Sequence, residues 1–296
     1  MMQNKTVEIS YFKAWKGKQL AINQLRGDPV KSFKLHPAYL YMIEQVNPGS
    51  TTHLKVNEDG SFKYMFLAYR ACIAGFRYMR KVISVDGTYL TGKYKGVLLI
   101  ATAQDGNHHQ YPIAWAVVDS ECEESWTWFF EKLHELISDD VELLFISDRH
   151  KRIINGLASV YKQARHGHCI WHLGQNIKLG PKSKVGGIAL FMQAAKAYKQ
   201  VEFGELYEKM KNSYPGITKY LEASIDREKW AIAYFPGSRY NIMTTNGSES
   251  INAKLVFARE LTMIALLDAI QSLISSWFNN HRKAAVASTR HLTPWA

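Results

Sequence analysis

The chain has 296 residues, 47% of them hydrophobic, and its 37 Lys and Arg against 26 Asp and Glu give a formal net charge of +11. This hydrophobic fraction excludes an intrinsically disordered protein, and the length allows one large domain or two modest ones. No apolar run in the sequence approaches the roughly 20 residues of a membrane-spanning helix, so no membrane partner is expected. Three widely spaced cysteines, Cys72, Cys122 and Cys169, do not form a disulfide framework and favour a reducing compartment.

The charge is unevenly distributed. Residues 1–80 carry 12 basic and 5 acidic side chains, residues 81–180 carry 10 and 12, and residues 181–296 carry 15 and 9. An acidic middle between basic flanks is typical of a protein that holds a nucleic acid over a cation-requiring centre. A solvated surface rich in lysine explains the charge alone equally well.

The first 80 residues are expected to form a basic helical and hairpin region. Two helical patterns come first, and apolar and polar residues then alternate around the turn Asn57-Glu58-Asp59-Gly60, which indicates a hairpin. These elements are expected at residues 6–26, 36–45, 54–56 and 62–66.

From Val82 the pattern changes to three β-rich runs separated by glycine-containing turns, which predict an antiparallel meander. A capping box at Ser120-Glu121-Cys122-Glu123 then starts a helix, and a strand, a helix and a short strand follow. The strands are expected at 82–86, 97–104, 111–118, 142–147 and 168–171, with a helix at 150–161. This order predicts an α/β fold, a mixed sheet of ribonuclease H-like layout with flanking helices.

The remainder of the chain is expected to be helical. Residues 180–240 show no strand signal and are interpreted as a helical insertion, and residues 261–279 are apolar at helical spacing. The predicted organisation is an N-terminal region, a core, an insertion, and C-terminal helices that complete the core. The corresponding boundaries are 1–80, 81–180, 181–244 and 245–296.

Three carboxylates are positioned to meet in this layout. Asp86 ends an apolar run, Asp148 ends the next strand after the first helix, and Glu249 lies near the start of a later helix. In a ribonuclease H-like sheet the two aspartate-bearing strands are neighbours. Two aspartates at strand ends and a glutamate on a helix can bind two divalent cations, which in turn contact a phosphodiester.

Each carboxylate also has a structural explanation that is favoured when it is taken singly. Asp86 precedes Gly87, a turn signal; Asp148 stands at a helix N-cap position; and Glu249 follows Asn246 by three residues, as in a capping box. The prediction of a metal-dependent site depends on the three occurring together, in this order, on these elements.

Other polar groups surround the candidate site. Arg149, Lys151 and Arg152 flank the second aspartate and are candidate phosphate contacts, although a solvated helix start explains them almost as well. The Cys-x-x-His pair Cys169 and His172 has no second cysteine pair, so zinc there is not expected. Asp105 with His108-His109 is expected to be a solvated hairpin tip.

The motifs resemble, in order, those of the MULE transposase domain of Mutator-like elements, which is related to the plant far-red response regulators. The resemblance covers roughly residues 60–285. The segments that carry it are Ser84-Val85-Asp86-Gly87-Thr88-Tyr89-Leu90, Tyr94-Lys95-Gly96-Val97-Leu98, Pro112-Ile113-Ala114-Trp115-Ala116, Glu124-Ser125-Trp126-Thr127-Trp128-Phe129, Ser147-Asp148-Arg149, Cys169-x-x-His172 and Thr245-Asn246-x-x-Glu249-Ser250-x-Asn252.

This resemblance implies a nuclear DNA transposase core that cleaves DNA at element ends with two Mg²⁺ or Mn²⁺ ions and then transfers strands. Asp86, Asp148 and Glu249 fall on the family's catalytic triad, and Cys169 and His172 on a signature of less settled role. The implied partners are terminal inverted repeats and target DNA, together with a homodimer or larger assembly. The family's terminal zinc-binding modules have no counterpart in this sequence, so a fragment of a longer transposase is a further expectation.

Two other functions remain open at this point. One is a domesticated, transposon-derived DNA-binding transcription regulator that keeps the fold without catalysis. The other is a ribonuclease or exonuclease on the same scaffold, which the Glu249 motif and the insertion disfavour.

Overall fold

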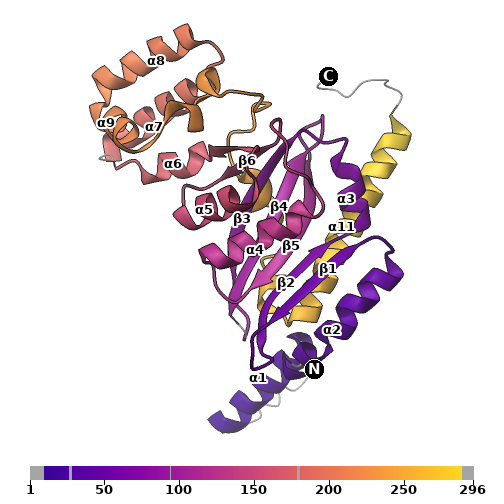
Figure 1. The fold of residues 1–296 in the computed structure, drawn as a ribbon. Helices are drawn as coiled ribbons and strands as arrows, with labels where there is room; N and C mark the ends of the chain where they lie inside the picture. Colours follow the sequence, from indigo (N-terminus) through magenta and orange to yellow (C-terminus); the bar gives the residue numbers. More distant parts are fainter. Residues whose placement is uncertain (1–9, 27–28, 94, 179–180, 289–296) are drawn as a thin grey trace.

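The structure is a computed structural model that describes residues 10–26, 29–93, 95–178 and 181–288. Within these residues, seven strands form one sheet in the order β1-β2-β5-β4-β3-β6-β7 (Figure 1). The strands are β1 (Thr51–Val56), β2 (Phe62–Ala68), β3 (Val82–Leu90), β4 (Gly96–Gln104), β5 (Gln110–Val118), β6 (Leu144–Ser147) and β7 (Arg165–His168).

The sheet combines antiparallel and parallel pairing. The strands β3, β4 and β5 form an antiparallel meander, and the β1–β2 hairpin extends it by pairing β2 with β5. On the other side, β6 runs parallel to β3 and β7 runs parallel to β6. The predicted mixed α/β fold with flanking helices is therefore confirmed.

Helices cover both faces of this sheet and extend from it at both ends (Figure 1). The α-helices are α1 (Tyr11–Arg26), α2 (Pro29–Val46), α3 (Arg70–Phe76), α4 (Glu123–His134), α5 (Lys151–Val160), α6 (Ile170–Asn176), α7 (Pro181–Lys196), α8 (Gln200–Ser213), α9 (Pro215–Ser224), α10 (Asn246–Lys254) and α11 (Met263–Ala287). Short 3₁₀ helices lie at η1 (Arg227–Lys229), η2 (Ile232–Tyr234) and η3 (Ala258–Glu260). None of the helices in the described ranges has both the length and the hydropathy to cross a bilayer.

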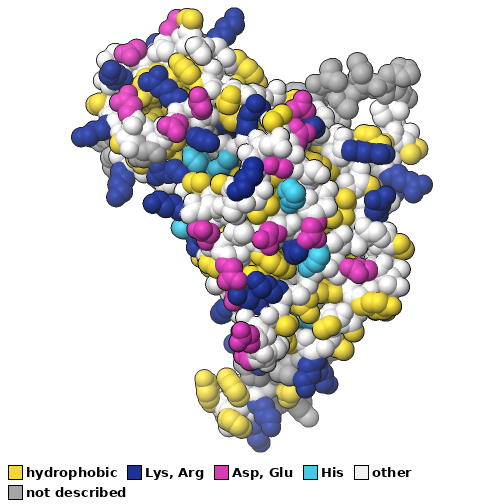
Figure 2. Space-filling view, viewed as in Figure 1, with side chains coloured by type: hydrophobic (Ala, Val, Ile, Leu, Met, Phe, Trp, Pro, Cys, Tyr) yellow, Lys and Arg dark blue, Asp and Glu magenta, His cyan; other side chains and the backbone are white. Residues whose placement is uncertain are grey.

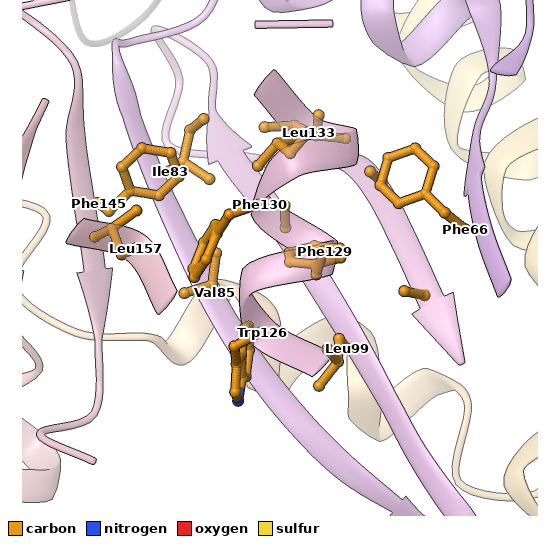
Figure 3. Close-up of a cluster of buried hydrophobic side chains, with 14 of the residues drawn as sticks. Phe66, Ile83, Val85, Leu99, Trp126, Phe129, Phe130, Leu133, Phe145 and Leu157 are labelled. Carbon is orange, nitrogen blue, oxygen red and sulfur yellow. The ribbon is translucent and has the colours of Figure 1, made fainter. Parts of the chain in front are cut away.

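Alternation along the strands builds two hydrophobic clusters, one on each face of the sheet. Phe66 and Leu99 point to the face covered by α4 and α5, where Trp126, Phe129 and Phe130 pack (Figure 3). Their neighbours in sequence point to the opposite face, which α2, α10 and α11 cover. Because both faces are covered, the central strands are apolar throughout, and the clear polar alternation of a half-exposed sheet is absent from them.

The helices α6 to α9, with η1 and η2, have a hydrophobic cluster of their own. Phe191, Phe203 and Trp230 lie at its centre, and all three side chains are fully buried. Figure 1 shows these helices grouped at the end of the sheet away from α1 and α2. The chain enters and leaves this group side by side, since the Ile170 amide donates to the Met243 carbonyl at 2.9 Å.

Several expected boundaries were wrong in informative ways. The second helix starts at Pro29 and includes Pro37, which was expected at its start. The fourth helix begins after Cys122, whose amide donates to Ser125 Oγ at 3.0 Å, so the capping interaction lies two residues later than expected. Residues 70–76 form α3, a helix that the sequence pattern did not predict. Residues 6–9 of the expected first helix lie outside the described residues.

The last predicted strand was displaced by three residues. The segment 165–168 forms β7, whereas the residues from Ile170 onward begin α6 with Cys169 as N-cap. The final helix, α11, also continues to Ala287, beyond the expected end at residue 279.

Two helical glycines should respond in opposite directions to alanine. A Cβ at Gly156 in α5 would lie 3.0 Å from the Thr127 amide nitrogen and 3.1 Å from Trp126 Cβ in α4, whereas a Cβ at Gly204 in α8 meets nothing within 4 Å. Alanine improves helix propensity by about 1 kcal/mol, so Gly204→Ala should stabilise the protein by roughly that amount. Gly156→Ala should destabilise it by about 1 kcal/mol or more, because α5 must move away from α4. Urea unfolding of both variants measures this, and equal stabilisation by the two would contradict the close helix packing.

Candidate functional site

Asp86 lies in the interior of β3, not at its end as the sequence indicated, because the strand continues to Leu90. The adjacent strand β6 stops at Ser147, and its last pairing joins Ile146 to Ser84. Continuing this register by two residues brings Asp148 opposite Asp86. The strand β6 therefore ends before it reaches the level of Asp86, so β3 has no strand paired with it on that side at Asp86.

Asp148 does not cap the helix that follows it. The N-cap of α5 is His150, and Asp148 Oδ1 accepts a hydrogen bond from the His150 amide at 2.9 Å. The Ser147 hydroxyl donates to the Asp148 carbonyl at 2.6 Å. These two hydrogen bonds stabilise the turn after β6. Of the two carboxylate oxygens of Asp148, they use only Oδ1.

Glu249 lies one turn into α10, whose N-cap is Thr245. The expected Asn246–Glu249 capping box is absent because Asn246 is already helical. Instead, the Thr245 hydroxyl donates to Glu249 Oε1 at 2.9 Å and orients the carboxylate.

The helix α10 is fixed on the sheet by small polar residues. The Ser248 hydroxyl donates to the Ser84 carbonyl at 3.0 Å and lies 3.0 Å from Thr102 Oγ1. Gly247 allows this close approach, since a Cβ there would lie 2.0 Å from Gln110 Oε1. One turn further along α10, Asn252 Nδ2 donates to Asp86 Oδ2 at 3.0 Å. Glu249 and Asp86 are thereby held on the same side of the sheet.

Electrostatics show that the first and third carboxylates act on each other. Burial, and then the negative charge of Glu249, raise the pKa of Asp86 from 3.8 to about 6, although the charge of His172 and the Asn252 hydrogen bond act in the opposite direction. A negative charge on Glu249 therefore opposes ionisation of Asp86, and a cation bound to both carboxylates would oppose that effect.

His172 on α6 provides a positive charge beside the carboxylates. Its Nε2 lies 3.9 Å from Glu249 Oε1. The hydrogen bond to Cys169 raises the pKa of His172 to about 9, and the charges of Glu249 and Asp148 act in the same direction. These interactions favour the protonated form of His172, which would offset the negative charge of Glu249.

Cys169 is completely buried and joins α6 to the start of α10. Its Sγ accepts a hydrogen bond from the Thr245 amide at 3.4 Å, and it lies 3.4 Å from Thr245 Oγ1, whose proton goes to Glu249. Burial alone would raise the pKa of the thiol, but hydrogen bonds from His172 and Thr245 outweigh it and lower that pKa. Cys169 thus connects the start of α6, whose first turn carries His172, to the start of the helix that carries the glutamate.

The basic residues after Asp148 differ in their contacts. Arg152 donates to the Glu121 carbonyl at 2.7 Å and lies 3.3 Å from the Glu121 carboxylate, so its charge is engaged with the start of α4. The Arg149 guanidinium lies 5.5 Å from the centre of the Tyr220 ring in α9. Lys151 is exposed.

The donor set fits magnesium or manganese, which prefer carboxylate oxygens. In the described part of the chain, the ligand atoms of Asp86, Asp148 and Glu249 do not all lie within 4.8 Å of one another. A single ion bound by all three carboxylates would require their ligand atoms to lie that close together. Two ions about 3.5–4 Å apart, each bound by some of the carboxylates, would not. Burial and the charge of Glu249 raise the pKa of Asp86, and a cation bound by both carboxylates would remove the second of these two causes.

Sequence reasoning missed the roles of two residues that these contacts define. Asn252 orients Asp86, and Thr245 orients Glu249 and binds Cys169. Both lie in the same short motif as Glu249. The signal was the concentration of hydroxyl and amide side chains on one helix turn, but only the packing of α10 shows what each of them contacts.

Comparison with known proteins relates the chain to one family. Residues 82–176 match the sequence profile of the MULE transposase domain. Three similar proteins come from Arabidopsis thaliana. Protein FAR1-RELATED SEQUENCE 6 is 23% identical over 72% of this chain and 30% of its own length. Protein FAR1-RELATED SEQUENCE 5 is 28% identical over 46% and 17%. Protein FAR-RED IMPAIRED RESPONSE 1 is 24% identical over 47% and 17%.

The matched segments therefore span less than a third of each of these relatives. The profile match contains Asp86, Asp148, Cys169 and His172, and ends before Glu249. By its motifs, its profile match and its relatives, the chain matches the MULE transposase domain over residues 82–176 and is similar to the FAR1-related proteins of Arabidopsis thaliana.

Proposed function

We propose that this chain is the DNA-binding core of a transposase-derived nuclear regulator, built on a ribonuclease H-like fold. The order β5-β4-β3-β6-β7, with the first three strands antiparallel and the last two parallel to β3, supports this fold assignment. The relatives are the observation that favours regulation over transposition. Their names associate them with FAR1 and with an impaired far-red response.

The proposed partner is DNA, bound through its phosphates. The helical insertion, residues 181–244, carries 10 Lys and Arg against 6 Asp and Glu. Figure 2 shows Lys and Arg side chains spread over this part of the surface. Phosphate contacts of this kind release counterions, so affinity should fall steeply with salt. A homodimer or larger assembly on DNA is part of the same proposal.

A second candidate function is cleavage of DNA, and it is supported by the position of Glu249 on the helix whose Asn252 binds Asp86, with Asp148 just after the strand next to β3. Asp86, Asp148 and Glu249 would hold two Mg²⁺ or Mn²⁺ ions. When bound, such a pair supplies Lewis acidity to the attacking and leaving oxygens of a phosphodiester. Asn252 orients Asp86, and Thr245 orients Glu249. A protonated His172 would offset part of their negative charge. In transposition the cleaved substrates would be terminal inverted repeats, followed by strand transfer into target DNA.

One experiment separates the two functions. The purified chain is mixed with labelled duplex DNA at about 50 and 200 mM salt to measure binding, and with supercoiled plasmid and Mn²⁺ to measure nicking. The regulator predicts salt-sensitive binding and no nicking above background. The enzyme predicts nicking that Asp86→Asn and Glu249→Gln abolish.

Asp140→Asn is the matched control, because Asp140 is an exposed carboxylate before β6 that pairs with Lys81. Nicking that survives in both site variants, or that disappears in the control as well, would exclude the assigned carboxylates. Absence of DNA binding at the lower salt concentration would contradict both functions.

A further inference from the structure

A second group of potential metal ligands lies just beyond the end of β4, whereas Asp86 pairs with the middle of that strand. One ligand atom each from Asp105, His109 and His281 lies within 4.8 Å of the other two, a closeness reached by no other set of three His, Cys, Asp or Glu side chains in the described ranges. Asp86 pairs with Ile100, four residues before Gln104, whereas Asp105 follows Gln104 at the hairpin tip. Four strand positions correspond to roughly 13 Å, so this group is separate from the carboxylate site.

The hairpin tip orients two of the three side chains. Asp105 Oδ1 accepts hydrogen bonds from the amides of Asn107 and His109, at 2.8 and 2.9 Å. Its other oxygen, Oδ2, lies 2.9 Å from His109 Nδ1. One carboxylate oxygen thus stabilises the turn, and the other faces an imidazole.

The third side chain comes from α11, more than 170 residues later in the chain. The Trp277 carbonyl can only accept, so His281 Nδ1–H must donate the hydrogen bond of 2.8 Å between them. This hydrogen bond determines the tautomer and leaves Nε2 as a free lone-pair donor. Metal-binding histidines are usually oriented by a backbone carbonyl in this way.

Aromatic packing holds α11 in place over the hairpin. The His281 ring stacks on Trp277 with centroids 3.7 Å apart, and it meets the His109 ring at 4.9 Å. Trp277 and Phe278 in turn pack edge-on against Tyr111 of β5, at 5.2 and 6.1 Å. The hairpin tip, expected from the sequence to be merely solvated, is therefore apposed to the last helix.

We propose that Asp105, His109 and His281 bind one zinc ion that fastens α11 to the β4–β5 hairpin. Two imidazoles and one carboxylate are a frequent zinc ligand set, and water completes the tetrahedron. Nitrogen ligands favour zinc over magnesium, so the ion class differs from the one proposed at the carboxylate site. Bound zinc joins segments that are distant in sequence, and it should stabilise the folded chain in proportion to its free concentration.

The test uses EDTA-treated full chain, titrated with Zn²⁺ by calorimetry and with Co²⁺ as a spectroscopic probe of tetrahedral nitrogen coordination. His281→Phe removes the ligand but keeps a ring to stack on Trp277. Asp105→Asn removes the carboxylate. Each variant is expected to weaken Zn²⁺ binding at this site at least about tenfold and to lose the rise in melting temperature that zinc produces in the wild type.

Two controls keep this result specific. His108→Asn changes an adjacent histidine, and asparagine tolerates its positive φ of 64°. Asp86→Asn removes the carboxylate site instead, so the result does not depend on the proposed function. Both controls should bind zinc as the wild type does. Unchanged zinc affinity in His281→Phe and Asp105→Asn would overturn the proposal, and so would an equal loss in His108→Asn.

Discussion

Metal-free protein carrying Asp86→Asn is expected to unfold at a higher temperature than the wild type at about pH 7.5. The pKa of Asp86 rises from 3.8 in the unfolded chain to about 6 in the folded one, because the carboxylate is buried beside Glu249. A raised carboxyl pKa destabilises the fold wherever the group is charged. The penalty is full above pH 6, decreases as the pH falls from 6 to 4, and vanishes below. Its upper size is about 3 kcal/mol, a shift of several degrees for a chain of this length.

The measurement is a thermal melt in EDTA at about pH 7.5 and again at about pH 4.5, where only about a third of the difference should remain. Asp140→Asn is the control, and its effect on stability should have the opposite sign. Hydrogen bonds from the Glu142 amide and Lys81 lower the pKa of Asp140, so its charged form is favoured in the folded protein. It should not stabilise the protein at either pH. Adding Mn²⁺ should raise the melting temperature of the wild type more than that of Asp86→Asn. An asparagine variant less stable than the wild type at pH 7.5 would refute the electrostatic account.

Alanine at two buried tryptophans is expected to produce losses of similar size in different parts of the molecule. Trp126 packs between α4 and the sheet, and Trp230 packs within the cluster of α6 to α9; both are fully buried. Each substitution should cost about 3–5 kcal/mol locally. For Trp126→Ala that loss lowers the stability of the whole sheet. For Trp230→Ala it should unfold the insertion first, because the chain enters and leaves it at adjacent points.

Hydrogen exchange read by mass spectrometry distinguishes the two outcomes. Trp230→Ala should increase exchange in α7, α8 and α9 while β3, β4 and β5 stay protected. Exchange should also increase in α6, which carries His172 and contributes Ile170 and Leu173 to the same cluster. In Trp126→Ala the lost stability falls on the sheet. Exchange in α7, α8 and α9 should then increase only when the sheet itself unfolds. A single cooperative loss of protection in both variants would mean that insertion and sheet fold as one unit.

The strands were predictable because their patterns are local. The hairpin around Asn57-Glu58-Asp59-Gly60 and the meander of β3 to β5 appear as apolar runs broken by turn residues, and the structure has each of them. Predictions failed at boundaries, where a tertiary contact outweighs local preference. Pro37 lies inside α2 despite its missing amide, and β3 continues through Asp86-Gly87 because β4 pairs with both residues.

The structural explanations weighed for each carboxylate fail for local reasons that only coordinates reveal. Gly87 is in a strand, not a turn; His150 caps α5 in place of Asp148; and Asn246 is already helical, so Glu249 is not in the expected capping box. The helix starts shift by one or two residues and the end of β3 by four, differences that a periodic pattern does not resolve. Those shifts leave Asp86 without the expected turn role, and Asp148 and Glu249 without the expected capping roles.

The sequence by itself determined the apolar periodicity, and with it the order of strands and helices, the mostly helical character of residues 181–240, and the motif order that resembles the MULE transposase domain. These follow from properties of neighbouring residues, which a linear pattern contains. Tertiary structure alone decided what meets what: Asn252 with Asp86, His172 with Glu249, and His281 with the hairpin at Asp105. Such contacts join residues more than 70 positions apart, and their distances depend on how sheet and helices pack, which no local preference specifies.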